Sequence, residues 1–186
     1  MRILTYISAS TPTPAARVAL DFCLGARELG HEAILAGLIR TRETPGLTEL
    51  GAAADAVRIP FRLLHQRYRY DPGIIGQMET MFRRFKPHVY LSHDYLGAAV
   101  ARVARYRPAC VEHFVHEDGF EKTPMENHWM GRRLLKLTDG IIAPSSLCAD
   151  RIEKIGIKKE NITFATDPSE WIASAILRAT SLVISQ

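Results

Sequence analysis

A complete strand–helix–strand pattern stands in residues 2–39, RILTYISASTPTPAARVALDFCLGARELGHEAILAGLI. Its two ends, RILTYIS and EAILAGLI, are short apolar runs, as expected of parallel strands that are buried on both faces. Between them, the segment from Ala15 to Leu29 places Val18, Phe22, Ala26 and Leu29 on one helical face, and Gly30 follows as a helix stop. The stretch therefore predicts one crossover unit of a parallel sheet.

The same alternation continues along the rest of the chain. Segments of helical length separate further apolar runs: AVRIP (56–60), HVYLS (88–92), ACVEHFV (109–115), DGIIAP (139–144) and NITFA (161–165). Ser145 can cap a helix that ends at Gly156, and Asp167 can cap a last helix from about Pro168 to Thr180. The most loop-like sections are 42–56 and 67–73. We predict an α/β fold: a Rossmann-like open, mostly parallel sheet with helices on both faces.

Composition indicates one ordinary soluble domain. The chain has 186 residues, of which 47% are hydrophobic and 24% charged, enough to bury a real core. No apolar run reaches the roughly 20 residues that span a bilayer, and MRILTYISAS reads as a strand rather than a signal peptide. We therefore expect a cytoplasmic protein. Cys23, Cys110 and Cys148 lie far apart in apolar surroundings, which favours buried reduced thiols over disulfides or metal ligands.

Some of the basic residues are mixed with aromatic ones. The formal net charge is +4, and two basic and aromatic segments stand out: FRLLHQRYRY (61–70) and MFRRFK (81–86). Such a mixture fits a solvated face, and it also fits peripheral contact with the inner face of a membrane. Both interpretations stay open. No helix-turn-helix or RNA-binding signature is present, so we expect no nucleic acid partner.

Polar residues follow two of the predicted strands. In an open parallel sheet, ligands bind beyond the carboxyl ends of the strands, near the point where strand order reverses. HVYLS ends at Ser92 and is followed by His93 and Asp94, and ACVEHFV leads into the second group, His116, Glu117, Asp118 and Gly119. An imidazole beside carboxylates can exchange a proton or bind sugar hydroxyls. Their spacing is not that of a compact metal site, and a role as loop hydrogen-bonders stays open for His93.

The loop after the first strand borders the same edge. Ser10 and Thr11 can offer hydroxyls to a ligand there, but the loop lacks the glycines of a dinucleotide fingerprint, and Pro12 and Pro14 remove backbone donors. The chain also has no GxSxG elbow, no GxxxxGK[ST] loop and no pair of CxxC motifs. Hydrolase, nucleoside-triphosphatase and zinc-finger functions therefore lose most of their support.

Four segments, in this order, resemble a known family. They are RELGHEAILAG, FKPHVYLSHDYLGAAVARVA, VHEDGFE and RRLLKLTDGIIAPSSLCADRIEKIGIKKENITFA. Together they resemble the N-terminal, acceptor-side domain of retaining GT-B glycosyltransferases of the group-1, or family 4, type. The resemblance covers residues 1–166, and we expect residues 167–186 to form a C-terminal helix that packs on the same domain.

The resemblance implies transfer of a sugar from a nucleotide donor to an acceptor hydroxyl, with retention of configuration and without a bound metal or other cofactor. It places Ser92, His93 and Asp94 near the acceptor. It places His116, Glu117, Asp118 and Gly119 at a second rim segment that faces the sugar. The first loop, with Ser10 and Thr11, would approach the donor phosphates, although Thr-Pro-Ala-Ala stands where the family usually has glycines.

The family's donor-binding half, with two glutamates spaced E-x7-E, has no counterpart here, since no Glu is followed by another eight residues later. We therefore expect an acceptor domain that binds a sugar or glycolipid acceptor, is inactive alone and needs a donor-binding partner chain or domain. The alternative is a noncatalytic Rossmann-like scaffold or interaction module, which would use its exposed surface for protein contacts such as a homodimer.

Overall fold

The computed structural model describes residues 1–40, 48–68, 71–93, 100, 108–113, 133, 135–164, 170, 172–174 and 177. Within them lies a seven-stranded sheet with the order β3-β2-β1-β4-β5-β6-β7, and each pair of neighbouring strands is parallel. The strands are β1 (Arg2–Ile7), β2 (Glu32–Arg40), β3 (Phe61–Gln66), β4 (Val89–Ser92), β5 (Ala109–His113), β6 (Gly140–Ala143) and β7 (Ile162–Phe164). The predicted Rossmann-like α/β class is confirmed.

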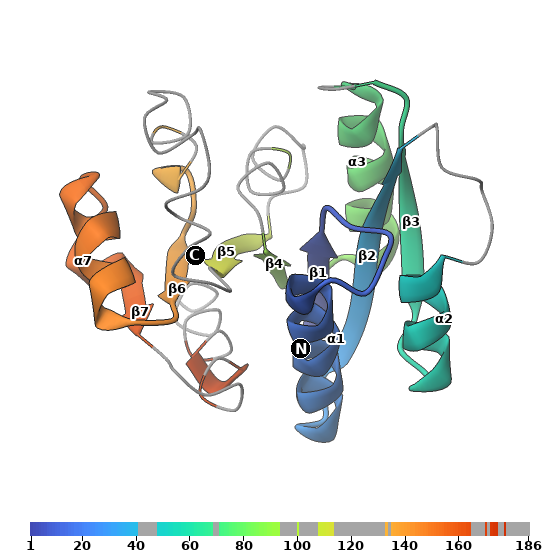
Figure 1. Cartoon of the computed structure of the whole chain (residues 1–186), viewed down its shortest axis with the longest axis horizontal. Coiled ribbons are helices and arrows are strands. Elements are labelled where there is room, and N and C mark those ends of the chain that lie inside the picture. The colour runs from blue at the N-terminus through green and yellow to red at the C-terminus, as the bar shows by residue number, and fades with distance from the viewer. Residues whose placement is uncertain are drawn as a thin grey trace.

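Helices cover the two faces of the sheet in separate groups. They are α1 (Pro14–Glu28), α2 (Glu49–Ala56), α3 (Gly73–Phe85) and α7 (Ser146–Lys154), and a 3-10 turn spans Lys159–Asn161. Residues of α1 and α2 share one buried cluster with Ile3, Leu35 and Leu91. Residues of α3 form a second cluster with Leu4 and Tyr6, whose side chains alternate with that of Ile3 along β1. Helix α7 packs on Ile141 and Ala143 of β6 (Figure 1).

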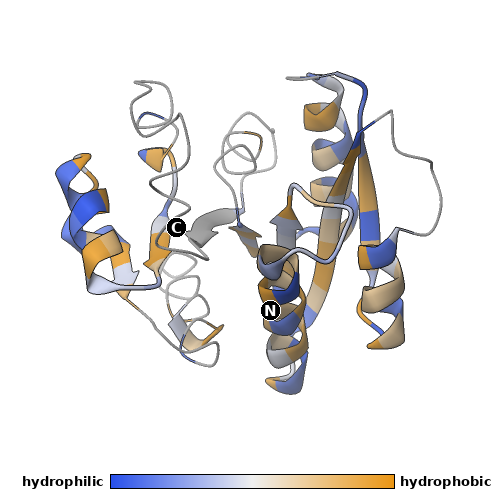
Figure 2. Ribbon diagram, viewed as in Figure 1, coloured by the Kyte–Doolittle hydropathy of each residue, from blue (hydrophilic) through white to orange (hydrophobic). Residues whose placement is uncertain are grey.

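Hydropathy follows this layering. Figure 2 shows β2 as mainly hydrophobic, whereas α7 has both hydrophobic and hydrophilic residues. Strand β2 lies inside the sheet, between β3 and β1, and most of its residues are buried. In α7, Cys148 and Ile152 are buried while the charged positions face outward. This is the pattern of an interior parallel strand and of a helix that covers a sheet.

The predicted end of α1 at Gly30 and both predicted ends of α7 are confirmed, and the structure adds a cap at the start of α1. Thr13 caps α1 by accepting the N–H of Ala16 at 3.2 Å, and Gly30 follows with a positive φ of 79°. Ser145 caps α7 by accepting the N–H of Cys148 at 3.1 Å, and Gly156 has a φ of 92°. A hydroxyl at the start and a left-handed glycine after the end are the local signals that these sequences carry.

Two local predictions are wrong. The third strand lies at Phe61–Gln66 rather than at AVRIP, and residues 49–56 of the predicted loop form α2, capped by Thr48. Strand β3 is at the edge of the sheet, and its exposed Arg62 and His65 interrupt the apolar run that interior strands show. The predicted run AVRIP instead contains the end of α2 and Ile59, which is buried beneath it.

Cys23 and Cys148 are buried free thiols, as predicted. Burial raises the pKa of the Cys23 thiol to about 12, so this thiol stays protonated and is a poor nucleophile.

The second basic and aromatic segment, residues 81–86, is partly in the core. Phe82 is fully buried, and Met81 packs against the core cluster that contains Phe82. Among the residues that the structure describes, no helix is long and apolar enough to cross a membrane.

Two histidines join elements at the amino edge, the side of the sheet where the strands begin. Nδ1 of His88 accepts the backbone N–H of Arg2 at 3.0 Å, which ties the entry of β4 to that of β1. Nδ1 of His31 lies 3.1 Å from the amino group of Met1. Partial burial is the main reason why the pKa of each imidazole is lowered, and nearby positive charge, from Arg2 and from the Met1 amino group, acts in the same direction. Both effects favour the neutral form of each ring.

Part of the C-terminal segment contacts α1. Glu170, Leu177 and residues 172–174 are helical. Ile172 is buried and belongs to the same cluster as α1, and its Cδ1 occupies the space that a Cβ on Gly25 would need. The absence of a side chain at Gly25 is what lets Ile172 pack there.

Candidate functional site

Strand order reverses between β1 and β4. The chain moves from β1 outward to β3, then returns to place β4 on the other side of β1. Tyr6 and Ser92 are partners in register, and the N–H of His93 donates to the carbonyl of Tyr6 at 3.0 Å. The residues after β1 and after β4 therefore meet at the carboxyl edge, the side of the sheet where the strands end. This is the position at which open α/β sheets bind ligands.

The loop after β1 is anchored toward β2 and α2. Leu38 of β2 donates its N–H to the carbonyl of Ala9 at 3.2 Å, and Leu50 of α2 donates to the carbonyl of Ser10 at 3.2 Å. A Cβ on Gly37 would lie 2.8 Å from the carbonyl oxygen of Ala9, so only glycine permits this close approach. The exposed Thr11 and the partly exposed Ser10 thus stand over the β2 side of the edge.

The first turn of α1 has few donors left for an anion. Pro14 at its start has no N–H, and the N–H of Ala16 already donates to Thr13 Oγ1. Helix N-termini bind phosphate through such groups. The geometry agrees with the absence of a glycine-rich fingerprint in this loop.

Near the switch point, the hydroxyl groups of Tyr6 and Ser8 are hydrogen-bonded to each other, a pair that the sequence analysis did not single out. Tyr6 is 1% exposed, and its hydroxyl lies 3.0 Å from Oγ of the exposed Ser8. The Tyr6 ring stacks on Tyr90 with centroids 6.3 Å apart, and Tyr90 meets Phe82 edge-on at 5.3 Å. The aromatic stack holds Tyr6, and Tyr6 in turn holds Ser8 at the carboxyl edge. Residues 6 and 8 are two positions apart, at the end of β1 and just beyond it, so the strand alternation lets both side chains lie on one face.

The candidate residues after β4 differ in how far a ligand can reach them. Ser92 is 0% exposed and His93 is 9% exposed, so His93 offers the more accessible side chain of the two. His113 lies in β5 as predicted, as the last residue of that strand. Asp94, His116, Glu117, Asp118 and Gly119 lie outside the described residues. Within the described ranges, no three His, Cys, Asp or Glu side chains are grouped as metal ligands.

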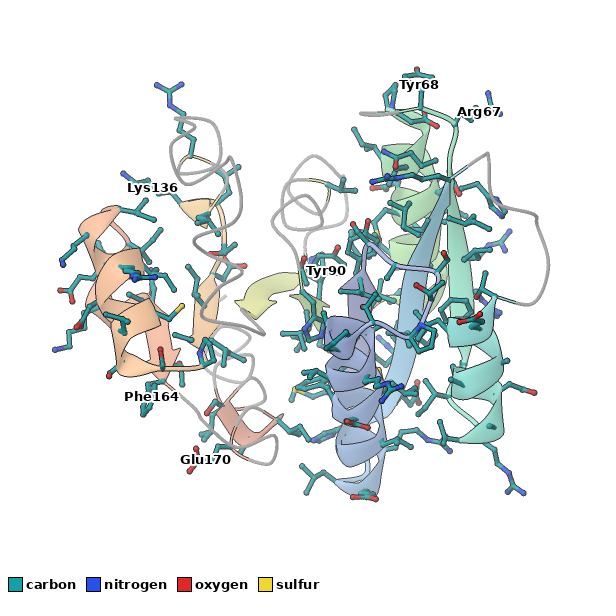
Figure 3. All side chains as sticks on the ribbon, viewed as in Figure 1. Arg67, Tyr68, Tyr90, Lys136, Phe164 and Glu170 are labelled. Carbon is teal, nitrogen blue, oxygen red and sulfur yellow. The ribbon has the colours of Figure 1, made fainter. Side chains whose placement is uncertain are left out.

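The turn after β3 is built around one carboxylate. The two oxygens of Asp71 accept the backbone N–H groups of Arg67 and Gly73, both at 2.8 Å, and the N–H of Asp71 donates to the carbonyl of Tyr68 at 3.1 Å. These two accepted bonds, helped by the nearby Arg67 charge, lower the pKa of Asp71. The turn presents Arg67 and Tyr68, both exposed, at the end of β3, where Figure 3 shows them projecting beyond the sheet.

Solved structures with the same fold include nucleotide-sugar enzymes. Anabaena HepE in complex with UDP aligns with a TM-score of 0.69 and 14% identity over 88% of this chain and 43% of HepE. UDP-GlcNAc 2-epimerase from Neisseria meningitidis, bound to UDP-GlcNAc, aligns at 0.63 and 14% identity over 95% of this chain and 50% of the epimerase. The lipopolysaccharide outer core galactosyltransferase WaaB aligns at 0.62 and 12% identity over 88% of this chain and 44% of WaaB.

The chain thus spans half or less of the length of these three structures. No curated protein matches it in sequence. A model of Glycosyltransferase Family 4 matches residues 15–165, a range that runs from the start of α1 past the end of β7. The chain therefore belongs to Glycosyltransferase Family 4 and has the fold of an N-terminal GT-B domain.

Proposed function

We propose that this chain is the acceptor-binding domain of a nucleotide-sugar-dependent glycosyltransferase. The observation that carries the proposal is the family match over residues 15–165, on a sheet whose switch point lies between β1 and β4. The chain spans 43% of HepE, so a donor-binding half, in the same polypeptide or in another, completes the enzyme. The 186 residues alone bind an acceptor and transfer nothing.

In this proposal, the acceptor sugar lies at the carboxyl edge above β1 and β4. His93 contacts it from the end of β4, beside Asp94 and above the buried Ser92. His116, Glu117, Asp118 and Gly119 approach the sugar from the segment after β5 and act through hydrogen bonds, because the donor half supplies the stabilisation of the leaving diphosphate. Ser10 and Thr11 border the donor side. The domain works in the cytoplasm, at the inner face of the membrane when the acceptor is a glycolipid.

The C-terminal segment completes the same domain. We propose that residues 167–186 form one helix packed on residues 1–166, and the buried Ile172 against α1 supports this arrangement. Because the loop that borders the site leads into α1, the segment stabilises the helix at which that loop ends.

The test is ligand binding by the isolated chain. Saturation-transfer NMR with a panel of mono- and oligosaccharides should detect a saturable sugar, and His93→Ala should weaken that signal. His65→Ala is the control, because His65 is exposed on the β3 edge strand, which is separated from β1 by β2. Calorimetry with UDP-glucose should show no micromolar binding, which would correspond to about −8 kcal/mol.

Two results would contradict the proposal. Micromolar binding of UDP-glucose by the isolated chain would mean that a donor site is present in these residues. No binding of any sugar, with the mass of a dimer in solution, would favour the noncatalytic scaffold, for which the exposed Leu147 and Phe164, at 50% and 53%, provide apolar contact surface.

A further inference from the structure

Three hydroxyl side chains lie on one face of the sheet beside the point where strand order reverses. Tyr6 and Tyr90 belong to the core cluster that packs on α3. Because side chains alternate between the two faces of a strand, Ser92, two residues after Tyr90, lies on the α3 face as well. Oγ of Ser8 lies 3.0 Å from the Tyr6 hydroxyl, which places it on the same side. Tyr6 and Ser92 are register partners, so this group of hydroxyls spans the two strands of the switch point.

A ligand at the carboxyl edge can touch one of these three hydroxyls directly. Tyr6 is 1% exposed and Ser92 is 0% exposed, whereas Ser8 is exposed. A serine hydroxyl can donate one hydrogen bond and accept two. Ser8 can therefore bond a ligand group and the Tyr6 hydroxyl at the same time, and the ligand senses Tyr6 only through Ser8.

The Tyr6 hydroxyl has a fixed position before any ligand arrives. The Tyr6 ring stacks on Tyr90 with centroids 6.3 Å apart, and Phe82 of α3 holds Tyr90 edge-on at 5.3 Å. The carbonyl of Tyr6 accepts the N–H of His93 at 3.0 Å, which fixes the backbone on the side of β4. Because the buried ring cannot move, its bond restrains Oγ of Ser8 and lowers the entropy that the serine loses on binding.

We propose that Ser8 is a specificity-determining residue of the acceptor site, whose Oγ forms a hydrogen bond with a hydroxyl of the sugar. Tyr6 is a positioning residue, which acts through Ser8 and does not touch the sugar. Both groups are uncharged, so the pair suits a neutral hydroxyl of a carbohydrate. A site that bonds a ligand hydroxyl discriminates against the analogue that lacks it. This inference rests on the proposed function and specifies part of its substrate: an acceptor sugar with an unsubstituted hydroxyl on the α3 side of β1.

The test compares sugars that differ by one hydroxyl, using the whole chain. The probes are methyl glucoside, galactoside and mannoside with their monodeoxy analogues, titrated by saturation-transfer NMR. For the wild type, loss of one particular hydroxyl should weaken binding about fivefold. Ser8→Ala should weaken binding of the parent sugar by a similar factor, and it should bind that deoxy analogue as well as the parent. Such a match between one protein hydroxyl and one ligand hydroxyl is not expected if Ser8 only stabilises the fold.

The role of Tyr6 has its own readout. Tyr6→Phe keeps the ring and removes the hydroxyl, so it should weaken binding of the parent sugar less than Ser8→Ala does. In a chain that already carries Ser8→Ala, Tyr6→Phe should have no further effect on affinity, because nothing is left for it to position. An equal effect of Tyr6→Phe in both backgrounds would remove Tyr6 from this role.

Two controls remove hydroxyls elsewhere. Thr80→Ala acts on an exposed residue of α3, and Tyr68→Phe acts on a tyrosine that is 60% exposed. Each should change affinity less than about twofold, and circular dichroism checks that every variant is folded. Wild-type affinity in Ser8→Ala, losses in the controls as large as in Ser8→Ala, or wild-type binding that is insensitive to every deoxy replacement would overturn the inference.

These results leave the proposed function standing, because the wild-type chain still binds a sugar in each of them. If the wild-type chain binds none of the three parent sugars, this inference falls. The proposed function falls with it only when the wider panel of mono- and oligosaccharides gives no binding either, so the two failures are distinguishable.

Discussion

Tyr6 links the hydrophobic core to the carboxyl edge through one hydroxyl group. Its ring is 1% exposed, and its hydroxyl lies 3.0 Å from Ser8 Oγ. Tyr6→Phe removes only this oxygen, and we expect a loss of about 1 kcal/mol in the free energy of unfolding. In a double-mutant cycle with Ser8→Ala, measured by urea denaturation, the coupling energy should be about 0.5–1.5 kcal/mol.

Tyr68→Phe is the matched control for this cycle, because Tyr68 is 60% exposed and lies on the turn after β3. Combined with Ser8→Ala, its effect should be additive. A coupling near zero for Tyr6 with Ser8 would mean that the bond does not hold Ser8 in solution. The sequence could not identify this pair, because a tyrosine in an apolar strand reads as a core residue until the place of its hydroxyl is known.

Strand β3 forms one edge of the sheet, and a helix side chain covers part of that edge. Oε1 of Gln77 accepts the N–H of His65 at 2.9 Å, and Nε2 of Gln77 donates to the carbonyl of His65 at 2.8 Å. The amide therefore fills the positions that another strand would occupy, and it protects the edge from pairing with a second molecule.

Gln77→Ala should expose these two backbone groups. Hydrogen exchange of the His65 amide, followed by NMR, should accelerate several-fold, since one bond contributes about 1 kcal/mol. Sedimentation should also show that the variant associates with itself more strongly than the wild type as protein concentration increases. Thr80→Ala on the same helix is the control, because the Thr80 hydroxyl bonds only within α3, to the carbonyl of Gly76. Unchanged exchange at His65 would show that Gln77 does not cover the edge in solution.

Whether a strand lies inside the sheet or at its edge decides how well it could be predicted from the sequence. Buried strands such as β1, β2 and β6 are apolar runs, and the hydroxyls and glycines at the ends of α1 and α7 are local signals. Strand β3 has Arg62, His65 and Gln66 among its six residues, so its pattern resembles a loop. The misplaced strand also hid that Arg67 and Tyr68 lie at the carboxyl edge. Ser92 and His93 were placed correctly at the end of β4, because HVYLS is an interior strand.

At the scale of the whole molecule, His31 and His88 make stability depend on pH. Their pKa values are lowered in the folded state from an ordinary value of 6.5, so the unfolded chain binds protons first as pH falls. Their contribution to the free energy of unfolding is complete above the ordinary pKa. It is lost as the pH decreases through that value toward the lower pKa values of the folded state. The urea concentration at the unfolding midpoint should therefore decrease as the pH is lowered from about 7.5 to about 5.

Asparagine can keep an acceptor oxygen near the position of Nδ1 without titrating. His31→Asn with His88→Asn should reduce the slope of the urea midpoint against pH, whereas His65→Asn, at an exposed position, should leave the slope as in the wild type. If the double variant keeps the wild-type slope, the pH dependence arises elsewhere, and the two imidazoles do not hold the amino edge as described.

The central position of β1 affects how the chain assembles during synthesis. Strand β1 is made first, yet one of its two neighbours, β4, begins only at Val89. While the ribosome makes the intervening segment, β1 can pair with β2 alone, and its other side presents unsatisfied backbone groups beside apolar side chains. Such nascent edges attract other unfinished chains. The arrangement that creates a ligand edge between β1 and β4 thus leaves one side of β1 open to association with other chains until residue 92 has emerged.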